Sequence, residues 1–240
     1  MFEIKILKLR HMGRESAVKL RPYIKECDIF SSEAAGRSEQ GADSFEKQWL
    51  SLLALSRTEF RRSLISPDNE YMAFIRELQE SLHYEKKPVH ILERFSETDS
   101  AMITAMARKF IGPYSLSFLE RATRGEEEPL RVLRSNLGDY LRSLLLRDQE
   151  IGRNLTTAES EIRRKAPSLS SKDKIRFTVC IGAYHYPENY TNIKTEIVEL
   201  PTPKTETDLL IKRLYSSGDW SDISDDDLKL FAGYTINNKG

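Results

Sequence analysis

The chain has 240 residues, of which 39% are hydrophobic and 31% charged, and 37 acidic residues balance 37 basic residues. This length suits one large α/β domain or two small ones, with enough apolar material to form a core. The neutral balance argues against nucleic acid or an anionic membrane as the main partner, because phosphate binding needs an excess of lysine and arginine.

The cysteines and the first residues indicate where the protein works. Cys27 and Cys180 lie far apart among apolar residues, which is typical of buried, reduced thiols in a cytosolic protein. The opening MFEIKILKLRHMG lacks the charged segment, apolar run and cleavage site of a signal peptide, and no apolar run approaches the length of a membrane span. We therefore expect a cytoplasmic protein.

Predicted strands and helices alternate along much of the chain. Strands are predicted from alternating or continuous apolar residues, and helices from apolar residues spaced three and four apart. In chain order these patterns predict a strand at 2–9, a helix over 14–27 that contains Pro22, a strand at 28–33, a loop at 34–44, helices over 45–64 and 72–82, a strand at 89–95, helical segments over 97–124, a long helix from 130 towards 155, a strand at 175–182, an edge strand at 192–200, and two short helices within 206–233.

The order of these elements predicts the fold class. Strands separated by helices are expected to be parallel, because parallel neighbours need crossover connections. We expect a single α/β domain over residues 1–240, with a mostly parallel central sheet flanked by helices. Residues 97–166 show no strand pattern and predict a helical layer or insertion, and residues 201–240 form a C-terminal extension.

Polar residues follow the predicted strands. In open parallel sheets ligands bind where the carboxyl ends of the strands meet. The residues are Arg10 and His11 after the first strand, Glu33 after the second, Glu93 and Arg94 at the end of the third, and His185 after the fourth. Taken alone, each is typical of an ordinary loop or helix cap, but polar residues at all four strand ends favour one shared pocket.

Such a group of side chains predicts hydrolysis by one of two routes. His11, Glu33 and His185 would hold a divalent metal, such as Mn, Zn or Co, with an open position for water. Without a metal, one histidine would act as general base, oriented by a carboxylate, and an arginine would stabilise the oxyanion. His83 and His90 are interpreted as structural, because one lies on a predicted helix and the other inside a predicted strand.

Four segments together resemble a known superfamily. They are LRHMGRESAVKLRPYIKECDIFSSE near the start, KPVHILERF in the middle, LRDQEIGRNL at 146–155 and GAYH at 182–185. These segments resemble the superfamily that joins erythromycin esterase-like proteins, Tiki and TraB proteins, and haem-binding ChaN-type proteins. In the same order, from about residue 4 to 190, they are similar to its strand-end histidine, its strand that ends in an acidic residue and arginine, its Arg-Asp helix and its Gly-x-x-His motif.

The resemblance implies a parallel-sheet α/β fold with a polar site at the strand ends. Carried over residue by residue, it assigns the site to His11, Glu33, Arg147 and His185, with support from Glu93, Arg94 and Asn154. Arg147 would stabilise the oxyanion and shares a helix face with Asn154, two turns later. The chain departs from the family pattern at Lys8, which stands where the first motif has glycine, and after Pro187, where the family usually continues into a helix.

We therefore expect a hydrolase of the ester or peptide class that acts on a small-molecule or peptide substrate. The alternative is a non-catalytic protein on the same fold that binds a metal, haem or a small ligand, and the two departures favour it. A dinucleotide-binding protein is disfavoured because no glycine-rich loop follows a strand. A serine hydrolase is disfavoured because the Gly-x-Ser-x-Gly elbow is absent.

Overall fold

A computed structural model of the chain describes residues 1–10, 13–32, 38–111, 114–201, 205–218, 220 and 223–237. The chain divides into two compact units. The sheet unit comprises Met1–Glu97 and Asp148–Thr202, and the helical unit comprises Thr98–Arg147 and Pro203–Gly240. The single domain expected over residues 1–240 stays a prediction, because two such units can belong to one domain.

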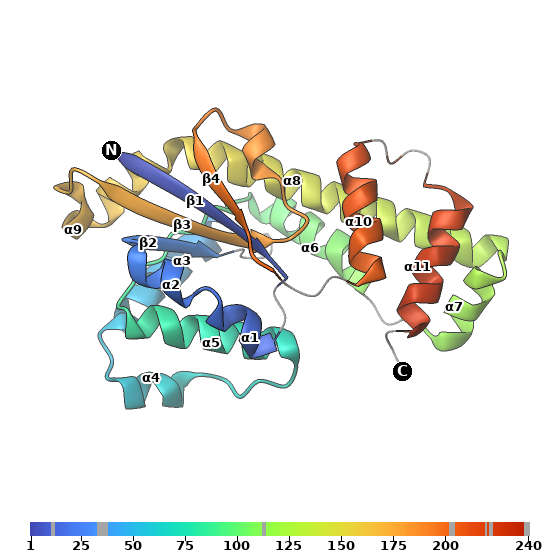
Figure 1. The fold of residues 1–240 in the computed structure, drawn as a ribbon, viewed down its shortest axis with the longest axis horizontal. Helices are drawn as coiled ribbons and strands as arrows, with labels where there is room; N and C mark the ends of the chain where they lie inside the picture. Colours follow the sequence, from blue (N-terminus) through green and yellow to red (C-terminus); the bar gives the residue numbers. More distant parts are fainter. Residues whose placement is uncertain are drawn as a thin grey trace. The chain divides into compact units, whose positions relative to one another are not determined.

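A four-stranded, all-parallel sheet lies at the centre of the sheet unit and confirms the predicted α/β class (Figure 1). The spatial order of the strands is β2-β3-β1-β4. The central pair is in register along its whole length, from Phe2 opposite Ile175 to Leu9 opposite Gly182. The predicted edge strand is confirmed as β4 beside β1. The strands are β1 (Phe2–Leu9), β2 (Ile29–Ser32), β3 (Ile175–Gly182) and β4 (Thr195–Glu199).

The prediction of a regular strand over residues 89–95 is wrong. This segment makes only isolated parallel bridges, Val89 with Phe30 and Phe95 with Ser38. Between them, the Ile91 N–H donates to the Glu46 carboxylate at 2.7 Å instead of to a neighbouring strand. The His90 N–H donates to the Phe30 carbonyl oxygen of β2, so the next N–H, that of Ile91, points away from β2 and bonds to a side chain on the other edge of the segment. Regular pairing with β2 is limited to the start of the segment.

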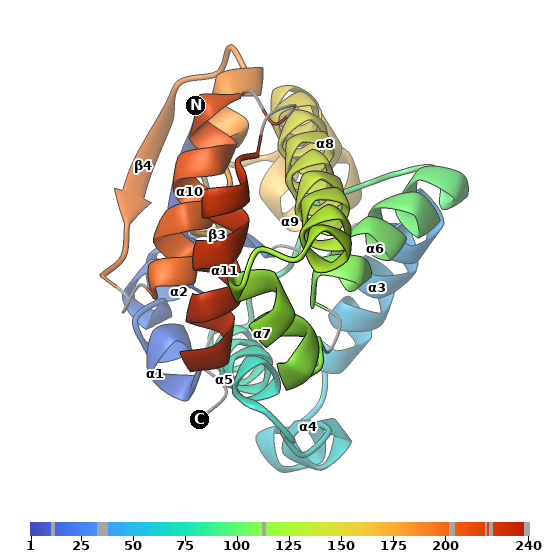
Figure 2. The same cartoon turned by 90° about the vertical axis from the view of Figure 1, so that its right-hand side faces the viewer.

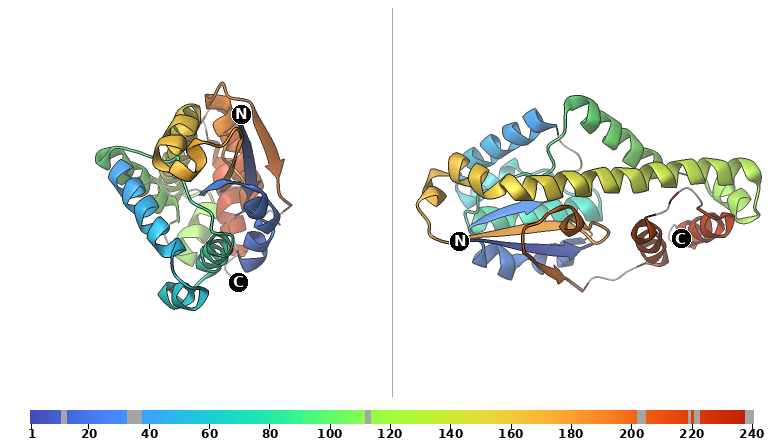
Figure 3. Two further views of the ribbon diagram at one scale, coloured as in Figure 1. Left: turned by 90° about the vertical axis from the view of Figure 1, so that its left-hand side faces the viewer. Right: turned by 90° about the horizontal axis from the view of Figure 1, so that it is seen from above.

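Helices cover both faces of this sheet. Ile4 and Ile6 of β1 pack with Ile151 and Leu155 of α8 (Glu127–Lys165), whose C-terminal half runs alongside the sheet (Figure 3). Leu7 and Leu9 point to the opposite face, because successive strand residues alternate in direction. They belong to a core cluster with residues of the following helices: α1 (Gly13–Val18), α2 (Arg21–Glu26), α3 (Glu39–Leu53), α4 (Arg57–Ser63) and α5 (Glu70–Tyr84).

Proline residues mark where two of the local structures begin. The helical pattern over 14–27 forms two helices, α1 and α2, with Pro22 in the first turn of α2. Proline suits that position, because the N–H it lacks has no partner within the helix there. Pro187 likewise begins the short 3-10 helix η1 (Pro187–Tyr190). A short helix, α9 (Pro167–Ser170), precedes β3.

The helical unit confirms the helical pattern over residues 97–124 and the two C-terminal helices. Its core includes Phe110, whose ring centroid lies 4.3 Å from that of Tyr140 and 5.1 Å from that of Phe231. Figure 2 shows α10 and α11 side by side. The unit contains α7 (Leu116–Thr123), α10 (Glu206–Ser217), α11 (Asp225–Asn237), most of α6 (Glu97–Ile111) and the first half of α8.

Within the described ranges, every helix is too short or too polar to cross a bilayer.

Candidate functional site

A buried histidine–aspartate pair lies just beyond the carboxyl end of β3. His185 follows Gly182, the last residue of β3, and its Nδ1 lies 2.5 Å from Oδ1 of Asp148 on α8. The other oxygen, Asp148 Oδ2, accepts a hydrogen bond from the Tyr186 N–H at 2.7 Å. His185 is 1% exposed and Asp148 0%. One buried carboxylate thus fixes both the imidazole and the backbone that carries it.

A close approach between α8 and η1 sets this geometry. A Cβ atom added at Gly152 would lie 2.7 Å from Tyr190 Cβ and 2.8 Å from the backbone oxygens of Pro187 and Tyr190. Glycine is therefore needed at this position for η1 to rest against the backbone of α8. Asp148 and Gly152 are four residues apart on one helix face, so the same face supplies both the carboxylate and the space for the turn.

Lys8 belongs to the same region. Its buried amine forms an ion pair with Glu188 of η1 and lies 4.1 Å from the ring centroid of Tyr186. The other carboxylate oxygen, Glu188 Oε2, is buried without a hydrogen-bond partner among the described residues. The residue that replaces the expected glycine therefore holds the turn that carries His185.

The two other members of the predicted metal set, His11 and Glu33, lie outside the described residues. A search of the described ranges finds no group of three or more His, Cys, Asp or Glu side chains placed to hold a metal ion. Since Nδ1 of His185 faces Asp148, a metal or substrate contact of this imidazole would involve Nε2.

The predicted supporting residues occupy different surroundings. Arg147 is buried and belongs to the helical unit. Asn154 donates to the Leu92 carbonyl oxygen at 2.7 Å and to Glu150 Oε1 at 2.8 Å, so it joins the 88–95 segment to α8. Glu93 is buried and lines a crevice with no room for a water molecule, so it faces no ligand pocket there.

Arg94 lies in a separate group of charged residues, which we call the His90 cluster: Asp43, Glu46, His90, Arg94 and Lys165. Arg94 contacts Asp43 at 2.7 Å and also pairs with Glu46. Lys165 contacts the same two carboxylates, at 2.8 and 3.1 Å. His90 Nδ1 lies 3.1 Å from Glu46 Oε1. Both cations are therefore held by both carboxylates, within the sheet unit.

The pKa values of these carboxyl groups reflect their partners. Burial alone would raise the pKa of Glu46, but the hydrogen bond from His90, the Ile91 N–H and the charge of Arg94 lower it to about 2. Hydrogen bonds from Lys165 and Arg94 lower the pKa of Asp43 to about 2 as well. Both groups are ionised at neutral pH, and the cluster holds α3, the 88–95 segment and the end of α8 together.

The sequence prediction missed Asp148, although it quoted the motif that contains it. The residue follows Leu141 by seven positions and Leu144 by four, so it falls within the apolar stripe of α8. A carboxylate in such a stripe needs a buried partner. This polar interruption, four residues before Gly152, is the signal that identifies Asp148.

Comparisons with family models, with curated proteins and with solved structures found no match. The superfamily resemblance therefore rests on the sequence motifs alone.

Proposed function

We propose that this protein is a hydrolase of the ester or peptide class, a divergent member of the erythromycin esterase-like, Tiki–TraB and ChaN-type superfamily, in which His185 is the general base and Asp148 orients it. The contact between His185 Nδ1 and Asp148 Oδ1, 2.5 Å long and buried, carries the proposal. Hydrolases use this arrangement, in which a carboxylate orients the histidine that activates a nucleophile.

The proposed reaction depends on which ring nitrogen of His185 carries the proton. In the proposed tautomer Nδ1 carries the proton and donates a hydrogen bond to Asp148, so the lone pair lies on Nε2. Nε2 takes a proton from water as the water oxygen attacks the carbonyl carbon of the substrate. The same nitrogen then returns the proton to the leaving oxygen or nitrogen as its bond to the carbonyl carbon breaks. The carboxylate of Asp148 stabilises the imidazolium formed between the two steps.

Two further roles belong to this proposal. Bound by His11, Glu33 and His185, a divalent metal such as Mn, Zn or Co would lower the pKa of a water molecule. In that form Asp148 would orient the ligating imidazole, as carboxylates do behind metal-bound histidines. Arg147 keeps the oxyanion role that the resemblance implies. The ion pair of Arg94 and the hydrogen bond of Asn154 instead hold other parts of the sheet unit together.

The test is hydrolysis of p-nitrophenyl esters and fluorogenic peptides by chelator-stripped protein, with and without added Mn²⁺ or Zn²⁺. We expect His185→Gln to lower kcat/KM about 10²- to 10⁴-fold, the range that a general base contributes. The matched control is His90→Gln, which alters another buried histidine beside a carboxylate. The proposal is wrong if no substrate is turned over, or if both variants lose activity equally while remaining folded.

The second candidate function is a binding protein for a metal, haem or a small ligand on the same fold. The burial of His185 and the buried Lys8 amine beside the same turn favour it. Calorimetric titration of chelator-stripped protein with Mn²⁺ and Zn²⁺ tests the metal form. One-to-one binding that is weakened in His185→Ala, in a protein without hydrolytic activity, would favour this function over the first.

A further inference from the structure

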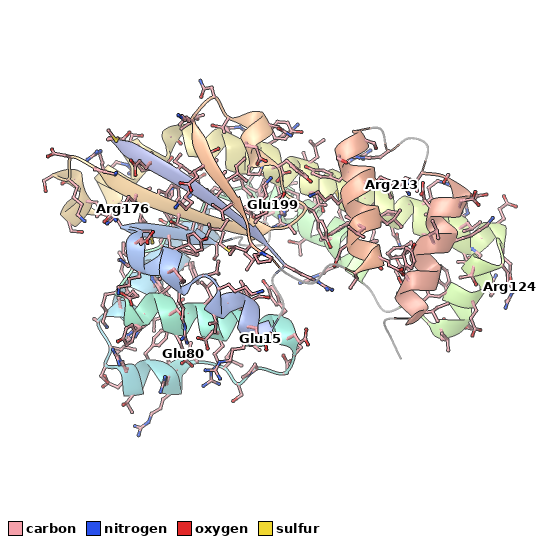
Figure 4. The ribbon with its side chains drawn as sticks, viewed as in Figure 1. Glu15, Glu80, Arg124, Arg176, Glu199 and Arg213 are labelled. Atoms are coloured by element: carbon pink, nitrogen blue, oxygen red, sulfur yellow. The ribbon has the colours of Figure 1, made fainter. Side chains whose placement is uncertain are left out.

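A pocket lined by arginines lies among helices of the sheet unit. Its volume is about 440 Å³, within the range of small-molecule sites. It is bounded by α1, α2, α4 and α5, and its described lining includes neither His185 nor Asp148. Four guanidinium groups line it, those of Arg14, Arg21, Arg57 and Arg61. Figure 4 labels Glu80 of α5, another lining residue.

One buried carboxylate holds two of these arginines. Glu77 accepts from Arg14 Nε at 2.8 Å through one oxygen and pairs with Arg21 through the other. The Glu77 side chain is 7% exposed, whereas those of Arg14 and Arg21 are 74% and 55% exposed. A guanidinium carries five N–H donors, so each arginine keeps further donors for a ligand. Glu77 thus fixes two cations at the pocket entrance.

The other two arginines are also held from one side. The Arg57 guanidinium lies 3.8 Å from the ring centroid of Tyr84, and Arg61 Nε lies 3.3 Å from Glu80 Oε2. Arginines fixed in advance lose less conformational entropy when they bind an anion. The pocket therefore presents four positioned guanidinium groups.

Charge and burial indicate the kind of ligand. The four arginines face three lining carboxylates, Glu77, Glu80 and Glu85. Ile24 and Phe60, also in the lining, are fully buried, and the ring centroids of Phe60 and His83 lie 3.9 Å apart. The lining thus combines exposed cationic groups with buried apolar side chains, which suits a small organic molecule with an anionic group.

We propose that this pocket binds a small organic anion through a phosphate or carboxylate group that accepts hydrogen bonds from Arg14, Arg21, Arg57 and Arg61. The planar guanidinium group can donate two parallel hydrogen bonds to two oxygens of one carboxylate or one phosphate group. The described lining contains neither His185 nor Asp148, and the proposal needs no reaction in this pocket.

The test is calorimetric titration of the full chain at low ionic strength with inorganic pyrophosphate and, separately, with succinate. We expect one-to-one binding of at least one anion, weakened by added salt. Arg14→Gln and Arg57→Gln should each weaken it about tenfold or more, the effect of losing a charge-assisted hydrogen bond. Arg57→Gln leaves no carboxylate unpaired, and circular dichroism checks that both variants are folded.

The matched control is Arg124→Gln. This arginine is also largely exposed and pairs with a carboxylate, but it lies in the helical unit (Figure 4). Binding of pyrophosphate alone would identify a phosphate ester as the ligand class, and binding of succinate alone a dicarboxylate. Absence of binding by both anions, or equal weakening in all three variants, would overturn the proposal.

Discussion

Two buried histidines of the sheet unit differ in what surrounds their carboxylate partners. His185 is 1% exposed and His90 is 2% exposed, and each has Nδ1 on a carboxylate. Glu46, the partner of His90, also receives Arg94, Lys165 and the Ile91 N–H. Asp148 instead binds the imidazole of His185 and the N–H of the next residue in the same turn.

The Glu46 partners named here come from three elements, whereas these two Asp148 contacts hold an imidazole and the turn that carries it. Glu46 connects α3, the 88–95 segment and the end of α8 through several partners. Asp148 fixes the position and tautomer of one imidazole at a strand end, where ligands bind in parallel sheets. A buried histidine–carboxylate pair is thus a poor sign of function by itself, and the other partners of the carboxylate and its place in the fold separate the two cases.

The largest stability effect is expected for Asp148→Ala. This change leaves the Tyr186 N–H and the His185 ring buried without the carboxylate that holds them. Each buried donor left without its acceptor costs about 1–3 kcal/mol, so the loss of two is a large part of the stability of a typical domain. Urea unfolding at pH 7 measures the free energy of unfolding. Asp148→Asn is the matched control, since the amide keeps an acceptor oxygen, and an equal loss in both variants would show that charge rather than hydrogen bonding dominates.

The His90 cluster should show its contribution in the pH dependence of stability. The pKa of Glu46 is about 2 in the folded protein against an ordinary 4.5, so its stabilisation is complete above about pH 4.5 and is lost as the pH falls towards 2. This shift corresponds to about 3 kcal/mol at most. We expect Glu46→Gln to lower stability at pH 7 by up to that amount and to reduce the loss between pH 4.5 and 2.

Unfolding free energies of the wild type and Glu46→Gln, measured from pH 7 to pH 2, check this expectation. Asp43 has a lowered pKa of its own, so part of the acid-induced loss should remain in the variant. Parallel curves for the two proteins would contradict the assignment of this stabilisation to Glu46.

The sequence predicted the parallel sheet because its strands are strongly apolar and are separated by amphipathic helices. It failed at residues 89–95, whose pattern is apolar enough for a strand. The segment pairs with β2 only near Val89 and His90, and on its other edge the Ile91 N–H bonds to the Glu46 side chain, more than 40 residues earlier in the chain. Periodicity describes local preference and carries no information about a distant carboxylate that takes a backbone N–H.

The candidate site was predicted in part for the same reason. His185 was found because it follows a clear strand, whereas its partner Asp148 lies on a helix that reaches the strand end only in the folded protein. Arg94 and Asn154 were grouped with His185 by motif and strand end, yet their hydrogen bonds lie with Asp43 and Leu92. The motifs named residues on α8 and after β3, and which of these side chains meet depends on how the chain folds.

The next effect in size concerns the contact between α8 and η1. Alanine is favoured over glycine in a helix by about 1 kcal/mol, but a Cβ at Gly152 would meet two backbone oxygens at 2.8 Å. Backbone atoms cannot rotate away as a side chain can, so the strain costs about 1–3 kcal/mol and outweighs the gain. We expect Gly152→Ala to lower the free energy of unfolding by about 1 kcal/mol or more and to displace the turn that carries His185, lowering any hydrolytic activity as well.

The smallest effect, and the opposite sign, is expected at another glycine of the same helix. A Cβ added at Gly138 would meet nothing within 4 Å, and its φ is an ordinary helical one. Gly138→Ala should therefore raise the free energy of unfolding by about 0.5–1 kcal/mol, through helix propensity and a less disordered unfolded chain. Urea unfolding of both alanine variants measures the pair. If both changes destabilise the protein alike, the helix as a whole resists substitution, and the close approach of η1 at Gly152 does not explain the loss.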